Sequence, residues 1–297
     1  MIFHRPSLAD KQWIKEIFSR ASDLSCEYTF GNIYAYQAKL DIHVARVGDC
    51  LITRCAVDNF TEYCYPVGTD VKKALDAIIE DAKLLSLDKV NLFGLNPSDA
   101  TALPLLYPGK FDIHENRDGG DYIYLAKDLA TLEGKKYQPK RNHISYFTRN
   151  NNWTYEEINR DNIAECLEMS HEWLNLCSPD LYEDLVSEEK CIIRAFDAFD
   201  ELDFRGGLLR VDGRVVAYTM GEAIDNDTFC VHYEKAFSHV RGAYPMINKE
   251  FVKNTLTDFT YINREDDLGI ENLRKAKLSY HPYRIYEKYD AFMELGE

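Results

Sequence analysis

Apolar residues recur at every third or fourth position in several segments of the chain, a spacing that predicts amphipathic helices. The clearest stripe comprises Val71, Ala74, Leu75, Ile78, Ile79, Ala82 and Leu85. Thr69 or Asp70 can cap this helix, because either side chain can accept a hydrogen bond from a backbone N–H group of the first turn. We expect further helices over 7–21, 161–174, 183–199 and 270–280, and one that begins near Pro245.

Short runs in which apolar and polar residues alternate predict strands. Two such runs flank Gly48-Asp49 and two more flank Asp212-Gly213, so each pair of runs predicts a hairpin. Further strands are expected at YCYPVG, VNLFGL, DYIYL, TFCVHYEKAF, FTYINRE and PYRIYEKYDAF.

The same order of elements occurs twice along the chain. In each half two helices precede a hairpin, and a strand, a helix, a strand, a short helix and a strand follow. Arg46 and Arg210 occupy the same place in the two hairpins, and they are 210 − 46 = 164 residues apart. This repetition indicates an internal duplication at the scale of a domain. We predict domains at 1–130 and 145–297, joined by a basic linker over 131–144.

Composition and charge narrow the class of protein. The 297 residues are 45% hydrophobic, and the formal net charge of −15 gives a surface that repels duplex nucleic acid and anionic lipid. No apolar run approaches the ~18 residues that span a bilayer, and the N-terminus has no signal pattern. We therefore expect a cytoplasmic protein with no integral membrane segment. The eight cysteines are scattered without a C-x-x-C motif, so we expect reduced thiols and no metal site.

One basic segment stands out in this acidic chain. It contains Lys135, Lys136, Lys140 and Arg141 within EGKKYQPKRN. A solvated linker is one interpretation of the segment. The other is a seam that binds an anion such as a phosphate.

A short turn in the second half has the features of a phosphate-binding loop. Arg241, Gly242 and Ala243 lie between the strand VHYEKAF and the helix that begins near Pro245. Glycine lets the backbone approach a ligand closely, and the N–H groups at the start of a helix attract anions. The turn by itself is a weak motif, and its position between a strand and a helix strengthens the prediction.

This arrangement resembles the GCN5-related N-acetyltransferase (GNAT) superfamily. There a strand leads to a loop of the type Q/R-x-x-G-x-G/A that binds the pyrophosphate of acyl-CoA, and a helix, a strand and a tyrosine-bearing helix follow. The matching pieces here are the turn at 241–243, the strand 259–263 and the helix 270–280. The resemblance implies acyl-CoA as a candidate co-substrate. The first half has PVGTDV at the equivalent place, without the basic residue, so we expect it to be a scaffold.

More closely, the chain resembles the C-terminal domain of phosphatidylglycerol lysyltransferases over nearly its whole length. The similarity rests on YTFGNIYAY, YLAKDLATLEGKKYQPKRNHISYF, GAYPMINKEF and YINREDDLGIENLRKAKLSYHPYR. It implies an α/β (α+β) protein with two tandem acetyltransferase-like (GNAT) domains, each a mixed, mostly antiparallel sheet flanked by helices. Characterised relatives of this fold move an aminoacyl group from charged tRNA to a lipid or a peptide, which makes charged tRNA a candidate partner.

Acyl transfer to an amine or a hydroxyl needs a base, an oxyanion donor and an acid for the leaving group. Glu234, at the end of the strand beside the turn, is our candidate base, with His232 on the same side of the strand; a surface carboxylate paired with Lys235 is the alternative. The resemblance gives Tyr280 the place of the acid, and a core tyrosine is the alternative. Asn248, one turn into the next helix, is expected to line the cleft.

Three acidic residues, Glu265, Asp266 and Asp267, follow the strand YINR. An acidic run is usually solvated. Its place at the C-terminal end of a strand favours a substrate site, where the carboxylates would hold a cationic amine or aminoacyl group. Arg264 is expected to be their counter-charge.

We predict an acyl- or aminoacyl-transferase in which an amine or hydroxyl of a small-molecule or peptide acceptor attacks a phosphate-bearing donor, acyl-CoA or aminoacyl-tRNA. The turn at 241–243 would hold the donor phosphate, and the basic segment would contact tRNA. A non-catalytic ligand-binding protein of the same fold is the alternative, because a fold alone does not fix a function.

Overall fold

The computed structural model describes residues 1–21, 23–57, 60–177 and 182–296. Contacts divide the chain into two compact units, each built on one mixed sheet. The first unit comprises Met1–Asp121, Asp266–Glu271 and Ile285–Glu297. The second unit comprises Tyr122–Glu265 and Asn272–Arg284.

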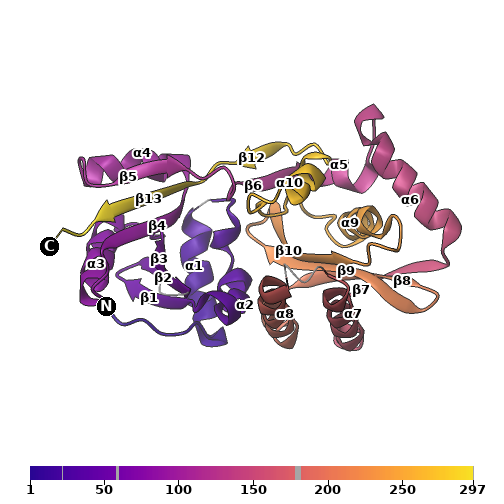
Figure 1. Cartoon of the computed structure of the whole chain (residues 1–297), viewed down its shortest axis with the longest axis horizontal. Coiled ribbons are helices and arrows are strands. Elements are labelled where there is room, and N and C mark those ends of the chain that lie inside the picture. Colours follow the sequence, from indigo (N-terminus) through magenta and orange to yellow (C-terminus); the bar gives the residue numbers. More distant parts are fainter. Residues whose placement is uncertain (22, 58–59, 178–181, 297) are drawn as a thin grey trace. The chain divides into compact units, whose positions relative to one another are not determined.

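Six strands form the sheet of the first unit. They are β1 (His43–Val47), β2 (Cys50–Val57), β3 (Phe60–Cys64), β4 (Lys89–Leu95), β5 (Asp112–Glu115) and β13 (Tyr289–Glu294). Their order across the sheet is β1-β2-β3-β4-β13-β5 (Figure 1). The pair β3–β4 is parallel, and the other neighbours are antiparallel. The predicted turn at Gly48-Asp49 joins β1 to β2.

Helices cover both faces of this sheet (Figure 1). They are η1 (Leu8–Asp10), α1 (Lys11–Ala21), η2 (Cys26–Tyr28), α2 (Phe30–Leu40), α3 (Val71–Leu84) and α4 (Pro97–Leu106). The predicted stripe of α3 packs on one face, with Ala74, Leu75, Ile78 and Ala82 buried in the core. Asp70 caps α3 by accepting a hydrogen bond from the Lys73 N–H, and Ser7 and Asp10 form a capping box at η1.

Seven strands form the sheet of the second unit. They are β6 (Asp121–Leu125), β7 (Trp153–Glu157), β8 (Arg205–Val211), β9 (Arg214–Ala223), β10 (Thr228–Ala236), β11 (Tyr261–Asn263) and β12 (Arg284–Tyr286). Their order is β12-β6-β11-β10-β9-β8-β7. The pair β10–β11 is parallel, and the predicted turn at Asp212-Gly213 joins β8 to β9.

Helices also lie on both faces of the second sheet. They are α5 (Ala126–Thr131), η3 (Lys135–Tyr137), α6 (Gln138–Asn150), α7 (Ile163–Asn175), α8 (Tyr182–Asp197), α9 (Ala243–Asn254) and α10 (Glu271–Leu278). α7 and α8 lie on one face and α9 on the other, while α5 and α6 pack against α9 (Figure 1). The sheet therefore holds α9, which follows the Arg-Gly-Ala turn, against its strands.

The two sheets have a similar strand order, and each contains one strand that comes from the other half of the sequence. In the first sheet β13, from the end of the chain, lies between β4 and β5; in the second, β6, from the end of the first half, lies between β11 and β12. The last strand predicted from the sequence, PYRIYEKYDAF, is therefore two strands in different sheets, β12 and β13. The tandem acetyltransferase-like α/β fold predicted from the resemblance is confirmed.

The segment expected to be a basic linker, 131–144, is largely helical, because it contains η3 and the first half of α6. Ile144 and Phe147 supply the reason, since both are buried and α6 packs on α9. The domain limits 1–130 and 145–297, which describe the duplicated halves of the sequence, stay a prediction. The two compact units are defined by contacts and do not test where the repeat begins or ends.

In the part of the chain that the structure describes, every helix is too short or too polar to cross a membrane.

Candidate functional site

The second sheet opens where β10 and β11 end. The two strands pair in parallel over three residues only, Thr228–Cys230 with Tyr261–Asn263. Against β9, the register of β10 shifts between Val231 and Tyr233, so His232 is the extra residue of a bulge. Side chains that follow the paired residues, at the C-terminal ends of both strands, gather into one cluster. Ligands of α/β proteins commonly bind at such ends.

Glu234 is at the centre of this cluster, as the sequence predicts for the candidate base. Its Oε1 atom lies 2.9 Å from Nη2 of Arg264, and its Oε2 atom accepts a hydrogen bond of 3.3 Å from Nδ2 of Asn248. The side chains of Glu234 and Arg264 are each 11% exposed. The alternative interpretation, a surface carboxylate paired with Lys235, is wrong, because Lys235 pairs with Glu188 at 2.7 Å.

Tyr280 and Lys140 lie on the other side of Arg264. The Arg264 guanidinium carbon is 4.9 Å from the centre of the Tyr280 ring, and the Lys140 Nζ atom is 3.8 Å from it. Burial raises the pKa of Tyr280, so its hydroxyl stays protonated at neutral pH. Burial, and then the charge of Arg264, lower the pKa of Lys140 to about 8. The structure thus brings Glu234, Asn248, Tyr280 and Lys140 together around Arg264.

The Arg-Gly-Ala turn begins α9, and Gly242 is its N-cap with φ 90°. A Cβ atom at this position would lie 2.4 Å from the carbonyl oxygen of His143, so α6 touches the turn and only glycine fits. A hollow runs beside the turn, lined in part by Lys140, Gly242 and Pro245. Arg241 stacks on Tyr146 of α6, with its guanidinium carbon 4.4 Å from the ring centre.

The basic segment has mostly local partners. Lys136 is 3.6 Å from Asp128, and Arg141 donates hydrogen bonds to the carbonyl oxygens of Leu132 and Gly134. Lys135 is exposed. Of the four cations, Lys140 is the one that reaches the Glu234 cluster.

The three acidic residues do not form one surface. Glu265 turns toward His232, while Asp267 is buried in the first unit, 3.5 Å from Arg117, and accepts a hydrogen bond from the Gly269 N–H. Asp266 is half-buried and also belongs to the first unit. The left-handed backbone of Glu265, with φ 57°, separates its side chain from those that follow. The expectation that Arg264 serves this run is wrong as well, because its ion pair is with Glu234.

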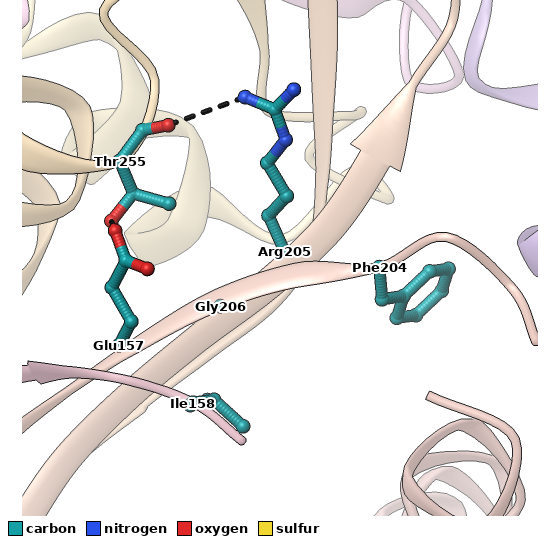
Figure 2. A pocket seen from close by; sticks show the side chains of 6 residues that line it. All are labelled: Glu157, Ile158, Phe204, Arg205, Gly206 and Thr255. Atoms are coloured by element: carbon teal, nitrogen blue, oxygen red, sulfur yellow. Dashed lines mark hydrogen bonds between the residues drawn. The ribbon is translucent and has the colours of Figure 1, made fainter. Parts of the chain in front are cut away.

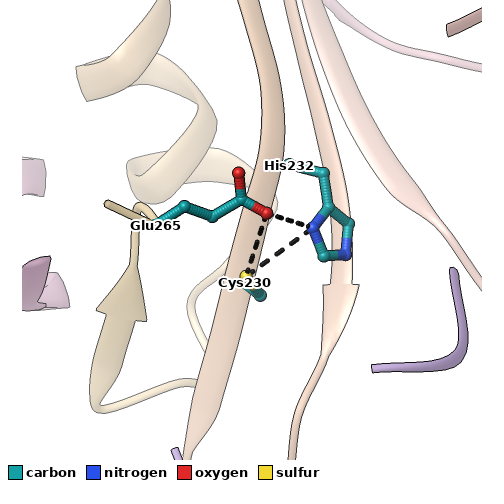
Figure 3. Close-up of side chains that lie close together, drawn as sticks. All are labelled: Cys230, His232 and Glu265. Atoms are coloured by element: carbon teal, nitrogen blue, oxygen red, sulfur yellow. Dashed lines mark hydrogen bonds and ion pairs between the residues drawn. The ribbon is translucent and has the colours of Figure 1, made fainter. Parts of the chain in front are cut away.

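His232 lies between two carboxylates, Glu265 and Glu222, that sequence reasoning did not connect; Figure 3 shows it beside Glu265 and Cys230. Its Nδ1 atom is 2.8 Å from Glu265, its Nε2 atom is 3.3 Å from Glu222, and the Cys230 sulfur is 3.7 Å from Nδ1. Burial opposes a charged imidazole, but Cys230 and the two carboxylates outweigh it and raise the pKa of His232 well above its usual value. An imidazolium balances this buried negative charge.

Among the residues that the structure describes, two groups of side chains offer the atom types that bind metal ions. Cys230, His232 and Glu265 form the first, in which a neutral imidazole would be needed for a metal bond. Cys26, Glu27 and Asp121 form the second. In the second group the Nζ atom of Lys288 already bonds Glu27 and Asp121, which leaves a cation no favourable place.

A further hollow lies along β8 (Figure 2), and Phe204, one of its lining residues, has its ring centre 5.6 Å from that of His232. It is lined by Glu157, Ile158, Phe204, Arg205, Gly206 and Thr255. Arg205 donates to the Thr255 carbonyl oxygen at 3.4 Å and to Asp258 at 2.8 Å, and the Thr255 hydroxyl donates to Glu157 at 3.2 Å. The two charged residues of its lining, Arg205 and Glu157, therefore each have a hydrogen-bond partner already.

Similarity to known proteins agrees with the geometry. A solved structure of a conserved protein of unknown function from Bacteroides thetaiotaomicron is 39% identical, covers 99% of this chain and 100% of that chain, and has a TM-score of 0.92. An uncharacterised protein of Mycoplasmoides gallisepticum is 26% identical over 217 residues, which are 67% of this chain and 65% of that protein.

The structure of L-PGS from Bacillus licheniformis has the same fold, with a TM-score of 0.65 at 14% identity over 96% of this chain and 92% of that one. The family described as phosphatidylglycerol lysyltransferase, C-terminal, matches residues 18–292. The chain belongs to the phosphatidylglycerol lysyltransferase C-terminal family.

Proposed function

We propose that this protein transfers an acyl or aminoacyl group from a phosphate-bearing donor, acyl-CoA or aminoacyl-tRNA, to an amine or hydroxyl of a small molecule or peptide. One observation carries the proposal. A buried carboxylate, Glu234, is held by a guanidinium and an amide at the C-terminal ends of β10 and β11. Lys140 links this carboxylate cluster to the hollow at the start of α9.

The chemistry assigns each group one task. Glu234 accepts a proton from the acceptor amine or hydroxyl as its nitrogen or oxygen attacks the donor carbonyl carbon. The bond from that carbon to the thioester sulfur or ester oxygen then breaks. The Tyr280 hydroxyl gives a proton to the departing sulfur or oxygen, and the proton that Glu234 accepted is then passed back to the Tyr280 oxygen, so that both groups return to their starting states. Transfer therefore needs no covalent intermediate on the protein.

The donor phosphate would bind at the hollow beside Gly242. The N-terminus of a helix attracts anions, Lys140 lines the same hollow with a positive charge, and Arg241 precedes Gly242 in the chain. Ala243 is the first residue of α9, so its backbone belongs to this terminus. For a tRNA donor, Lys135, Lys136 and Arg141 would contribute charge nearby. The acidic residues Glu265, Asp266 and Asp267 would not act as one group, because they have separate partners.

The test combines donor binding with transfer. Purified protein is heated with acetyl-CoA, longer acyl-CoAs, free CoA and charged tRNA, because a ligand of the native state raises the Tm. The donor that binds is then radiolabelled and offered to pooled amines and peptides. Glu234→Gln should lower the transfer rate by ~10²–10⁴-fold while the donor still raises the Tm. Glu62→Gln, on β3 of the first sheet, is the matched control and should transfer normally.

Two results would contradict the proposal. If Glu234→Gln transfers as fast as the unmodified protein, Glu234 is not the base. If a donor raises the Tm but no acceptor is ever modified, the ligand-binding alternative is the better account.

A further inference from the structure

The Glu234 cluster leaves two buried polar atoms without a hydrogen bond. They are Oδ1 of Asn248 and Nη1 of Arg264, neither of which has a partner among the described residues. Asn248 is 2% exposed. Buried polar atoms are almost always paired, because an unpaired one costs about 1–3 kcal/mol. Two in one cluster, on both neighbours of a single carboxylate, are a sign of a missing ligand.

The orientation of the Asn248 amide follows from its bond to Glu234. A carboxylate only accepts hydrogen bonds, so the NH₂ group of Asn248 must face Glu234, at 3.3 Å. The amide oxygen then points elsewhere and can accept one hydrogen bond. Arg264 is also oriented by Glu234, because its Nη2 atom donates a hydrogen bond of 2.9 Å to that carboxylate. Its Nη1 atom is then available to donate to another group.

The two unpaired atoms match a ligand that has one hydrogen-bond donor and one hydrogen-bond acceptor. Asn248 Oδ1 can accept from an N–H group, and Arg264 Nη1 can donate to a carbonyl oxygen. A group that carries both features, an amide or an α-aminoacyl group, offers a hydrogen-bond partner to each atom. A simple acyl chain satisfies only Arg264 and leaves Asn248 unpaired.

We propose that Asn248 and Arg264 are specificity-determining residues that recognise an N–H group and a neighbouring carbonyl oxygen on the substrate beside Glu234. This inference rests on the proposed function for the identity of the substrate. Two donors carry the pattern: acyl-CoA, in its pantetheine amides, and charged tRNA, in its α-aminoacyl end. The test has one arm for each.

Binding is measured by titration calorimetry with probes that do not react. Free CoA carries the amides, and 3′-phosphoadenosine 5′-diphosphate carries the same phosphates without them. Puromycin, a stable aminoacyl nucleoside, carries the aminoacyl pattern, and its aminonucleoside lacks the acyl group. In whichever arm contains the substrate, the complete probe should bind the unmodified protein at least ~10-fold more tightly than its truncated partner.

Two variants assign that difference to the two residues. Asn248→Leu removes the amide with little change in volume, and Arg264→Lys keeps the charge beside Glu234 but removes Nη1. Each should weaken the complete probe ~10-fold or more and leave the truncated probe unchanged. Asn254→Leu is the control, because Asn254 lies on the same helix and bonds Glu250 instead. Thermal unfolding verifies that each variant is folded.

The inference is overturned if the complete probes bind no better than the truncated ones, if neither complete probe binds at millimolar concentration, or if both variants bind as the unmodified protein does. In those cases water molecules satisfy the two atoms. The outcome is separate from that of the proposed function. If the complete probe binds more tightly than the truncated one but no group is transferred, the role of Asn248 and Arg264 in recognition stands and the proposed function fails. If a group is transferred but the two probes bind equally well, only the role of Asn248 and Arg264 is refuted.

Discussion

Both units bury charged side chains at the C-terminal ends of their parallel strand pair, and they use them differently. In the first unit, the Lys288 Nζ atom lies 2.8 Å from Glu27, 2.9 Å from Asp121 and 3.5 Å from the Cys26 sulfur. Burial opposes its charge, but Asp121, Cys26 and Glu27 outweigh it and raise the pKa of Lys288. A lysine has three donors, so this cation is saturated.

In the second unit the Glu234–Arg264 pair is as well placed but not saturated. Nη1 of Arg264 and Oδ1 of Asn248 remain open, and Lys140 continues the cluster into a hollow. A saturated buried cluster stabilises a fold and has no capacity for a ligand. An unsaturated one keeps hydrogen-bonding capacity for a substrate. The difference supports the first unit as scaffold and the second as the working half.

The largest effect should come from the saturated cluster. Lys288→Met leaves Glu27 and Asp121 buried without a counter-charge, so we expect a loss of roughly 3–5 kcal/mol in the free energy of unfolding by urea. Lys72→Met, which removes an exposed ion pair with Asp76, should change stability by about 0.5 kcal/mol or less. A loss below ~1 kcal/mol for Lys288→Met would contradict the structural role.

The Arg-Gly-Ala turn gives the next effect. Gly242 and Gly213 both have left-handed backbones, at φ 90° and 84°, but only Gly242 has a neighbour within reach of a Cβ atom. Gly213→Ala should therefore lose about 1 kcal/mol from backbone strain, and Gly242→Ala about 1–3 kcal/mol more from the contact with α6. Equal losses in urea unfolding would mean that α6 does not constrain the turn.

His232 should show a dependence on pH. Because its pKa is raised in the folded protein, its contribution is complete below the unfolded value near 6.5 and is lost as pH rises through the folded value. His232→Gln should therefore lose roughly 1–3 kcal/mol at pH 6 and less at pH 9. A loss that instead grows with pH, and disappears after treatment with a chelator, would indicate a metal bound by Cys230, His232 and Glu265.

Lys140 should give the smallest effect. Its pKa of about 8 means that the ammonium loses its charge between pH 7 and pH 9. Affinity for the donor should fall ~3–10-fold over this range, and Lys140→Arg, which stays charged, should remove the dependence. Calorimetric titrations at the two pH values measure it. An unchanged dependence in the variant would place the titrating group elsewhere.

The sequence predicts local structure where one segment decides it. The stripe of α3 and the turns at Gly48-Asp49 and Asp212-Gly213 depend on neighbours within a few residues, and all are confirmed. The exchange of β6 and β13 was not predicted, because alternation within a strand says nothing about which sheet it joins. α6 was missed because its polar composition hides the two buried residues, Ile144 and Phe147.

In the candidate site too, the sequence predicts what depends on local neighbours and misses what depends on tertiary contacts. Glu234 was found from its place at the end of a strand beside the turn. Its partner Arg264 was assigned to the acidic run, since adjacency in sequence suggested that pairing. The positive φ of Glu265 and the parallel pairing of β10 with β11 decide the partners instead, and no local sequence pattern predicts either. Lys140 reaches the cluster only because α6 is a helix.

The central claim is that the second unit binds the donor and the first unit is a scaffold. Hydrogen–deuterium exchange with and without the donor that raises the Tm tests it most directly. The account predicts slower exchange in the first turns of α9 and in 261–265, with no change in the first turns of α3 and in 92–96, the equivalent places of the first unit. Slower exchange in the first unit alone would contradict the account, because the saturated cluster would then be the one that holds the donor.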